Sequence, residues 1–141
     1  MTNIFYNLGQ IENVVDQILL NAEPGLYCFY GDLGAGKTTL IKSLVQKLGG
    51  VDAGNSPTFG LVSEYHDKAG NLLAYHLDCY RLETEEEALD FGIEEYLEAD
   101  CWVFVEWPDK IASLLPGRRT DMYLTHEGFD KRQLILKHLP L

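Results

Sequence analysis

The sequence predicts an α/β fold: a single domain over residues 1–141 with a central, mostly parallel sheet, flanking helices and added antiparallel strands. Two dense apolar runs, at 26–30 and 101–105, are typical of parallel strands that are buried on both faces. Apolar residues at helical spacing follow the first run until Gly49-Gly50. A chain of 141 residues with 46% apolar and 11% aromatic residues suits one compact core.

The apolar patterns predict a succession of helices and strands along the chain. The first half contains a helix over 11–19, a strand over 26–30, a helix ending at Gly49-Gly50, a polar loop over 49–57, and a hairpin of strands 58–65 and 72–78 joined by a turn at 66–71. The second half contains short helices over 85–91 and 93–97, a buried strand over 101–105, a helix after Pro108, and closing strands over 121–125 and 132–139.

The most specific motif is the octapeptide Gly31-Asp32-Leu33-Gly34-Ala35-Gly36-Lys37-Thr38, between the first apolar run and the helix that follows it. It has the G-x-x-x-x-G-K-[ST] pattern of a P-loop NTPase domain. Its glycines allow a tight curl whose N–H groups point inward at a phosphate, and the helix dipole favours the same anion. Lys37 reaches the β- and γ-phosphates, and the Thr38 hydroxyl binds magnesium. The predicted nucleotide-binding residues are Asp32, Leu33, Gly34, Ala35, Gly36, Lys37, Thr38 and Thr39.

A P-loop that hydrolyses a nucleotide also needs an acid near magnesium, usually at the end of an apolar strand. Glu106 ends the run 103–105, where a parallel strand opens toward the ligand crevice. Asp78 ends another apolar strand and supplies a second carboxylate. We therefore predict Glu106 and Asp78 as catalytic residues and, together with Thr38, as magnesium ligands.

Three further features have two interpretations each. Ser56-Pro57-Thr58-Phe59 follows a glycine-rich loop, where Thr58 suits either a nucleotide-sensing switch or a plain turn into a strand. Trp107 is either core packing or an aromatic surface beside the site. His76, Tyr80 and Arg81, taken singly, are more typical of structural positions than of catalytic ones.

The net charge of −11 argues against direct binding of nucleic acid, because phosphate contacts normally need a basic surface. Nine acidic and no basic residues lie from Glu83 to Asp100, which is either a solvated helix face or a docking surface for a basic partner protein. The cysteines Cys28, Cys79 and Cys101 have no metal-ligand spacing and indicate free thiols in a reducing cytoplasm. No apolar stretch approaches the ~20 residues of a membrane span, and no signal peptide is visible.

Four motifs in order resemble those of the TsaE family, also called YjeE. They are the P-loop at 31–39, Ser-Pro-Thr-Phe at 56–59, His-Leu-Asp-Cys-Tyr-Arg-Leu at 76–82 and Glu-Trp-Pro at 106–108. The similarity spans nearly the whole chain, including residues 91–97. Members of this family are small bacterial P-loop ATPases required to make threonylcarbamoyladenosine beside the tRNA anticodon. Gly60 departs from the family pattern, because many relatives have a threonine there, so a second switch hydroxyl is not expected.

The resemblance implies a magnesium-dependent protein that binds ATP, hydrolyses it slowly and works as an accessory motor. It assigns Lys37 and Thr38 to phosphate and magnesium, Asp78 and Glu106 to magnesium and hydrolysis, Thr58 to a nucleotide-sensing switch, and Trp107 to the surroundings of the site. The implied partners are a TsaB–TsaD pair, in which TsaD performs the transfer, and tRNA is contacted only through these partners. ATP would then permit repeated turnover of the pair.

The residues alone leave three other functions open. A small-molecule kinase needs an acceptor pocket and an arginine-rich lid, for which only Arg118-Arg119 is suggestive. A GTPase normally has an Asn-Lys-x-Asp loop, and this string does not occur. An interaction module without catalysis would not depend on Lys37. Arg81, Arg118 and Arg119 are the candidates for an arginine that stabilises charge during hydrolysis, unless a partner supplies it.

Overall fold

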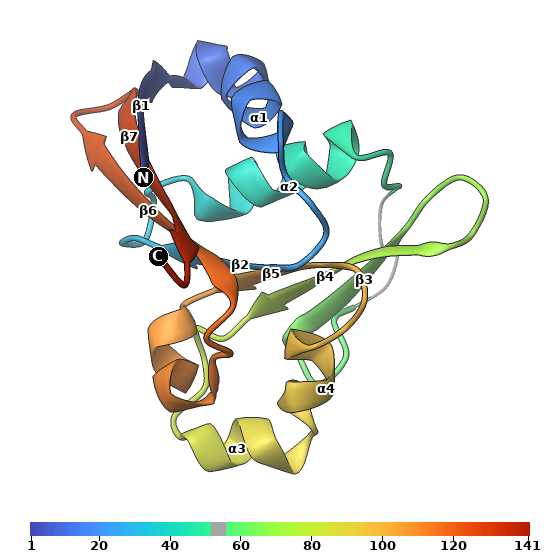
Figure 1. The fold of residues 1–141 in the computed structure, drawn as a ribbon. Coiled ribbons are helices and arrows are strands. Elements are labelled where there is room, and N and C mark those ends of the chain that lie inside the picture. The colour runs from blue at the N-terminus through green and yellow to red at the C-terminus, as the bar shows by residue number, and fades with distance from the viewer. Residues whose placement is uncertain (52–55) are drawn as a thin grey trace.

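The computed structural model describes residues 1–51 and 56–141, within which seven strands form one sheet (Figure 1). The strands are β1 (Thr2–Asn7), β2 (Leu26–Tyr30), β3 (Val62–His66), β4 (Leu72–Asp78), β5 (Trp102–Glu106), β6 (Arg119–Glu127) and β7 (Lys131–Leu139). Their order is β1-β7-β6-β2-β5-β4-β3. The central strands β6, β2, β5 and β4 are parallel, and β1, β7 and β3 pair antiparallel at the edges. The predicted α/β fold is therefore confirmed.

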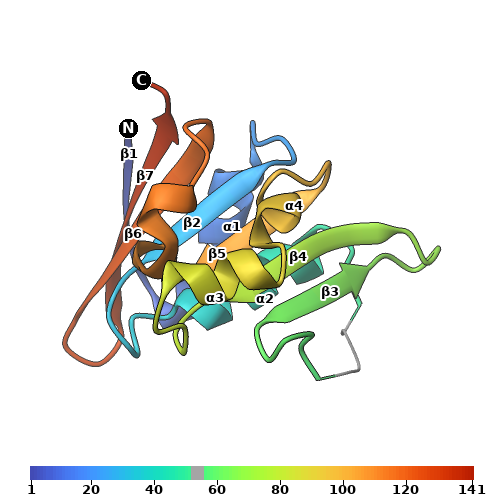
Figure 2. The same cartoon turned by 90° about the horizontal axis from the view of Figure 1, so that it is seen from below.

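Helices cover both faces of this sheet (Figures 1 and 2). One face carries α1 (Ile11–Leu19), which follows the 3-10 turn η1 (Leu8–Gln10), and α2 (Lys37–Lys47). The other face carries α3 (Glu85–Asp90), α4 (Ile93–Leu97) and the 3-10 helix η2 (Pro108–Leu114). In the described part of the chain, no helix combines the length and the apolar character needed to cross a membrane.

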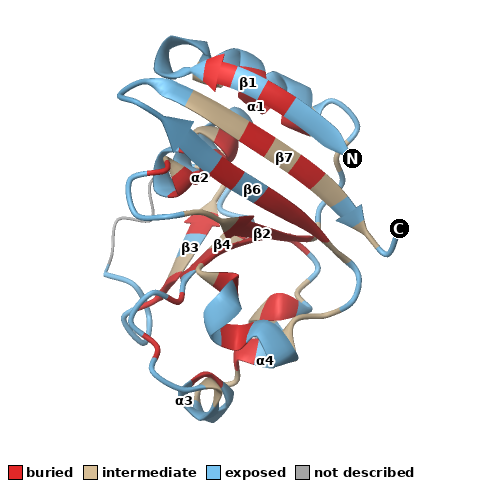
Figure 3. Ribbon diagram, turned by 90° about the vertical axis from the view of Figure 1, so that its left-hand side faces the viewer, coloured by how far each residue is buried: buried red, intermediate tan, exposed pale blue. Residues whose placement is uncertain are grey.

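The core consists of two apolar clusters, one on each face of the sheet. Because side chains alternate along a strand, Phe104 joins the cluster under α1 and α2, whereas Val103 and Val105 join the cluster under α3 and α4. Figure 3 shows the central strand β2 almost wholly buried, in contrast to the mixed burial along β7, which lies between β1 and β6. Helices on both faces thus explain why β2 and β5 are continuous apolar runs.

Two predicted elements differ from the structure. The strand predicted over 58–65 begins only at Val62, because Phe59 and Gly60 have positive φ values of 55° and 72° that turn the chain. The helix expected after Pro108 is a 3-10 helix, interrupted at Ile111, whose φ of −129° is not helical. The loop predicted over 49–57 lies partly outside the described residues.

The other predicted elements agree with the structure within a few residues, apart from the N-terminal strand. The sequence patterns do not predict β1, in which only Ile4 and Tyr6 are buried. The first closing strand is longer than predicted, since β6 spans Arg119–Glu127 rather than 121–125. Of these two strands, β1 forms one edge of the sheet, and β6 belongs to its parallel centre.

Candidate functional site

The carboxyl ends of three neighbouring strands meet at one edge of the sheet, where they gather the predicted site residues. There β2 leads into the P-loop, β4 ends at Asp78 and β5 ends at Glu106. In the pairing of β4 with β5, Asp78 is the register partner of Glu106. A pocket of about 500 Å³ opens at this edge, and both acids line it. It is also lined by the predicted residues Leu33, Gly34, Gly36, Lys37, Thr38, Thr39 and Trp107.

The P-loop has the curled backbone that its glycines favour. Gly31 packs so closely against β6 that a Cβ atom there would lie 2.6 Å from the carbonyl oxygen of Leu124. Gly36 has a φ of 98° and forms the N-cap of α2. The first turn of α2, whose N–H groups have no acceptor within a helix, borders the pocket at Lys37, Thr38 and Thr39. This arrangement of N–H groups and helix dipole favours an anion in the pocket.

Glu106 connects α2 and β4 through its two carboxylate oxygens. The Thr38 hydroxyl donates to Oε1 over 2.7 Å, and Nε2 of His76 lies 2.6 Å from Oε2. The side chain is buried at the end of β5. Burial by itself raises the pKa of Glu106, but the hydrogen bonds with His76 and Thr38 and the charge of Lys37 hold that pKa below its ordinary value. Glu106 is therefore ionised at neutral pH and held beside the P-loop.

Lys37 is buried although it is charged. Its Nζ donates to the carbonyl oxygen of Gly31 and lies 3.7 Å from the centre of a Trp107 ring. Burial lowers the pKa of Lys37, while nearby carboxylates, led by Glu106, act in the opposite direction. The ammonium group is thus held between the backbone of the P-loop and the indole of Trp107 by contacts that a phosphate can replace.

Trp107 has a backbone conformation that is rare for a large side chain. Its φ of 55° and ψ of 51° lie in the left-handed region. The ring packs against that of Tyr80, with 5.0 Å between centroids, and both residues line the pocket. Such strained residues cluster at functional sites. Trp107 therefore borders the pocket as well as the apolar core.

The other predicted residues lie away from the pocket. Thr58 is exposed in the turn before β3, where its N–H donates to Val62, and it does not line the pocket. Asp32 and Ala35 belong to the loop without lining the pocket. Thr58 remains a predicted switch residue, and nothing in the described residues brings it into contact with the P-loop.

The three arginines that the sequence offers as candidates do not line the P-loop pocket. Arg118 and Arg119 lie where β6 begins. Because β6 runs parallel to β2, this beginning lies at the amino ends of the parallel strands, opposite to the edge that carries the P-loop. Arg119 is already paired with Asp121 at 3.0 Å. Arg81 is exposed and does not line the pocket. None of these three lines the P-loop pocket in this arrangement.

Sequence reasoning did not predict several residues at the site, among them His76, which contacts Glu106, and Arg132. His76 lies two positions before Asp78 on β4, so the alternation of a strand sends both to the face that carries α2. That spacing is a signal that the sequence offers. Arg132 lines the same pocket from β7, and only the strand order brings it there. Its position in the sequence gives no comparable signal.

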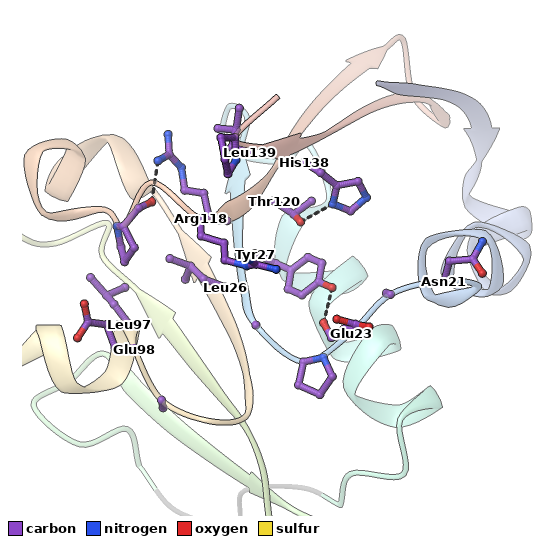
Figure 4. Close-up of a pocket in the computed structure, with 17 residues that line it drawn as sticks. Asn21, Glu23, Leu26, Tyr27, Leu97, Glu98, Arg118, Thr120, His138 and Leu139 are labelled. Atoms are coloured by element: carbon purple, nitrogen blue, oxygen red, sulfur yellow. Dashed lines mark hydrogen bonds between the residues drawn. The ribbon is translucent and has the colours of Figure 1, made fainter.

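A second pocket, of about 730 Å³, lies at the amino edge of the parallel strands (Figure 4). Two pairs of its polar groups are hydrogen-bonded within the protein: Thr120 Oγ1 lies 2.7 Å from His138 Nδ1, and the Tyr27 hydroxyl donates to the Glu23 carbonyl over 2.7 Å. The P-loop and both strand-end acids lie at the other edge. The smaller P-loop pocket is therefore the candidate functional site.

The residues of the P-loop pocket suit a magnesium ion that is shared with phosphate and water better than a metal whose ligands all come from the protein. Among the described residues, no group of three or more histidine, cysteine, aspartate or glutamate side chains could bind a metal. Thr38, Glu106 and Asp78 offer oxygen donors at one edge of the pocket. Magnesium commonly takes one or two carboxylates and completes its shell with water and phosphate oxygens. These donors match that pattern.

Comparison with known proteins places the chain among relatives of the same architecture. The family model described as "Threonylcarbamoyl adenosine biosynthesis protein TsaE" matches residues 6–134. The "tRNA threonylcarbamoyladenosine biosynthesis protein TsaE" of Bacillus subtilis is 41% identical over 114 residues, which cover 80% of this chain and 70% of the relative. The protein of the same description from Nostoc is 38% identical over 141 residues, with 94% and 83% covered.

A solved structure agrees with these sequence matches. The crystal structure of YdiB from Bacillus subtilis has a TM-score of 0.72 to this chain at 27% identity, and the match covers 98% of this chain and 86% of YdiB. The similarity thus extends through the central sheet, the P-loop and the added edge strands. A family model that spans most of the sequence and relatives of this similarity lead to one conclusion: the chain belongs to the TsaE family.

Proposed function

We propose that this protein binds ATP with magnesium, hydrolyses it slowly, and assists the formation of threonylcarbamoyladenosine in tRNA. The names of its relatives, which describe tRNA threonylcarbamoyladenosine biosynthesis, support this role. In this proposal the protein is a P-loop ATPase of the cytoplasm that acts on a TsaB–TsaD pair. The partners hold the tRNA, and ATP hydrolysis supports their repeated turnover.

The observation that carries the proposal is the 2.7 Å hydrogen bond from Thr38 to Glu106. It joins the hydroxyl that binds magnesium in a P-loop to a carboxylate at the end of a parallel strand. A glycine turn with a purely structural purpose has no need for a buried, ionised carboxylate at this threonine, because burying a charge is unfavourable. The pair is what a magnesium–nucleotide site requires.

The side chains divide the chemistry among them. Lys37 would exchange its contact with Gly31 for the β- and γ-phosphates. Thr38, Glu106 and Asp78 would hold magnesium, which when bound neutralises charge on the phosphates. Glu106, ionised because its pKa is low, accepts hydrogen bonds and can orient the attacking water. Thr58 would respond to the γ-phosphate as a switch, and Trp107 would close the pocket beside Lys37.

The positions of the arginines and the acidic surface support slow hydrolysis by the chain alone and a protein partner. The arginines Arg118 and Arg119 stand at the wrong edge of the sheet to stabilise charge on a γ-phosphate. The acidic run from Glu83 to Asp100 lies on and around α3 and α4, and it would repel tRNA and attract a basic protein surface. A partner protein is thus the expected source of both stimulation and RNA binding.

Two substitutions test this function. Lys37→Ala should abolish measurable ATP binding, whereas Glu106→Gln should still bind ATP but release phosphate about 100-fold more slowly, since its charge is lost. Glu23→Gln, which removes an exposed acid at the opposite edge, should change neither property. Magnesium-dependent calorimetry measures binding, and phosphate release measures hydrolysis. Unaltered ATP affinity in Lys37→Ala would contradict the proposal.

The same assay tests the role of the partners. Phosphate release by the chain alone should be slower than the roughly 1 per second at the low end for kinases, and a TsaB–TsaD pair with substrate tRNA should accelerate it. Turnover of tens per second without partners would contradict the accessory role. Phosphate transfer to a metabolite instead of water would favour a kinase.

A further inference from the structure

His76 is a buried polar residue next to the P-loop pocket, and the proposed chemistry gives it no role. Only 7% of its surface is exposed, and it does not line the pocket. It lies on β4 two positions before Asp78, so that alternation places both side chains on the face of the sheet that carries α2. In the pairing of β4 with β5, its register partner is Phe104, which belongs to the core on that face. His76 therefore lies one step deeper in the sheet than the two strand-end acids.

The carboxylate of Glu106 is directed toward this deeper residue. Its Oε2 lies 2.6 Å from Nε2 of His76, although the residue opposite Glu106 in the register is Asp78. Oδ1 of Asp78 accepts a hydrogen bond from the N–H of Tyr80 over 3.1 Å. The two acids thus differ in their surroundings, since Asp78 is exposed and Glu106 is buried against His76.

The two oxygens of Glu106 accept from donors of different kinds. An ionised carboxylate can only accept, so Nε2 of His76 carries a proton and donates it to Oε2. The hydroxyl of Thr38 donates to Oε1, and its oxygen keeps lone pairs that suit a metal. Thr38 lines the pocket, whereas His76 does not. The hydrogen bond from His76 therefore anchors Glu106 from inside the protein.

We propose that His76 is a positioning residue whose Nε2–H fixes the carboxylate plane of Glu106, so that Oε1 stays beside Thr38 at the magnesium site. This inference rests on the proposed function, because it assumes magnesium and a nucleotide in the pocket. The terminal torsion of a glutamate side chain has a broad energy minimum, and a donor on each oxygen narrows it. In this role His76 contacts neither the metal nor the nucleotide and acts only through Glu106.

Two amide variants separate the N–H donor from the ring. Gln carries its amide nitrogen about as far from the backbone as Nε2, whereas the shorter Asn reaches only about as far as Nδ1. His76→Asn should bind ATP without magnesium as the wild type does, because Lys37 and the P-loop are intact. It should lose about 10-fold or more of the affinity gained with magnesium and hydrolyse ATP about 10–100-fold more slowly, as expected when a partner of a metal ligand is removed. His76→Gln should recover most of both losses.

Calorimetry with and without magnesium measures the first effect, and phosphate release measures the second. Crystal structures of the unliganded variants add a readout that does not depend on ATP: the 2.7 Å contact between Thr38 and Glu106 should be lost in His76→Asn and kept in His76→Gln. Thr120→Ala removes a buried hydroxyl near the opposite edge of the sheet and should leave magnesium and ATP binding unchanged. Thermal unfolding verifies that each variant is folded, and His76→Leu replaces His76→Asn should the latter unfold.

A folded His76→Asn with the wild-type response to magnesium, or with an unchanged contact between Thr38 and Glu106, would overturn the inference. Equal losses in the Gln and Asn variants would overturn it as well, because packing of the ring and not the N–H donor would then matter. Weaker ATP binding without magnesium would place the effect on the P-loop and count against a role through Glu106. A wild-type protein that does not bind ATP, or whose ATP affinity does not respond to magnesium, would contradict the proposed function itself, and the inference with it.

Discussion

Glu106, on β5, connects this strand to α2 and β4 through side-chain hydrogen bonds. It stands at the end of β5, accepts from Thr38 on α2 and pairs with His76 on β4. Its carboxylate is buried and ionised, so each partner offsets part of the desolvation of its charge. Removing one partner leaves a buried charge with too few hydrogen bonds, which costs more than the bond itself contributes.

The coupling between His76 and Glu106 should be measurable as a stability effect. His76→Ala and Glu106→Gln should each destabilise the fold, and the double variant should lose less than the sum, with a coupling of roughly 0.5–3 kcal/mol. Urea unfolding of the four proteins measures this cycle. Thr120→Ala, on β6 near the amino edge, should combine with Glu106→Gln additively. Strict additivity for the pair of His76 and Glu106 would show that their 2.6 Å contact contributes nothing to stability.

Among single residues, sequence reasoning found those whose roles follow from a motif or from the end of a strand. Lys37 and Thr38 belong to the P-loop pattern, and Glu106 and Asp78 end apolar runs; all four line one pocket. His76 resembled an ordinary buried histidine, because its partner lies 30 positions away and the strand pairing decides the contact. The alternation along β4 places His76 on the same face of the sheet as Asp78, but it does not predict that His76 contacts Glu106.

The P-loop packs closely against β6 at Gly31. A Cβ atom on Gly31 would lie 2.6 Å from the Leu124 carbonyl oxygen, which is backbone and cannot move aside alone. Gly34, with a φ of 82°, has nothing within 4 Å of its Cβ position. Both glycines have a positive φ, 154° at Gly31 and 82° at Gly34, and Gly31 is needed in addition for its close approach to β6.

These two positions give a matched pair of substitutions. Gly34→Ala should cost about 1–2 kcal/mol of unfolding free energy through backbone strain alone. Gly31→Ala should cost about 1–3 kcal/mol more, because β6 or the loop must shift. Thermal and urea unfolding of both variants provide the comparison. Equal stabilities for the two would mean that the contact with β6 is not as tight as the structure has it.

Among the elements, the long apolar patterns and the hairpin turn at 66–71 were predictable, whereas the turn at Phe59 and Gly60 was not. The strands β2 and β5 follow from continuous apolar runs, and α1 from amphipathic spacing. The late start of β3 depends on Phe59, a residue whose type does not favour a positive φ. The strand β1 buries only two side chains and depends on β7 as a partner, so its local signal is short.

The whole molecule brings distant parts of the sequence to one edge of the sheet. The P-loop, Asp78, Glu106 and Arg132 meet in one pocket because β2 lies at the centre of the strand order (Figure 1). Composition and motif were enough to predict an α/β fold with a parallel centre. The strand order was not predictable in the same way, since it depends on how the chain crosses over the sheet, and Arg132 escaped notice for this reason.

The central claim is that this edge of the sheet holds magnesium and the phosphates of ATP. The most direct measurement is a crystal structure of the protein grown with magnesium and a non-hydrolysable ATP analogue. We expect the phosphates to lie against the backbone of Gly34, Gly36 and Lys37, and the metal to lie beside Thr38 and Glu106. A structure in which the analogue leaves the P-loop empty, or in which the metal lies far from Glu106 and Asp78, would contradict the account.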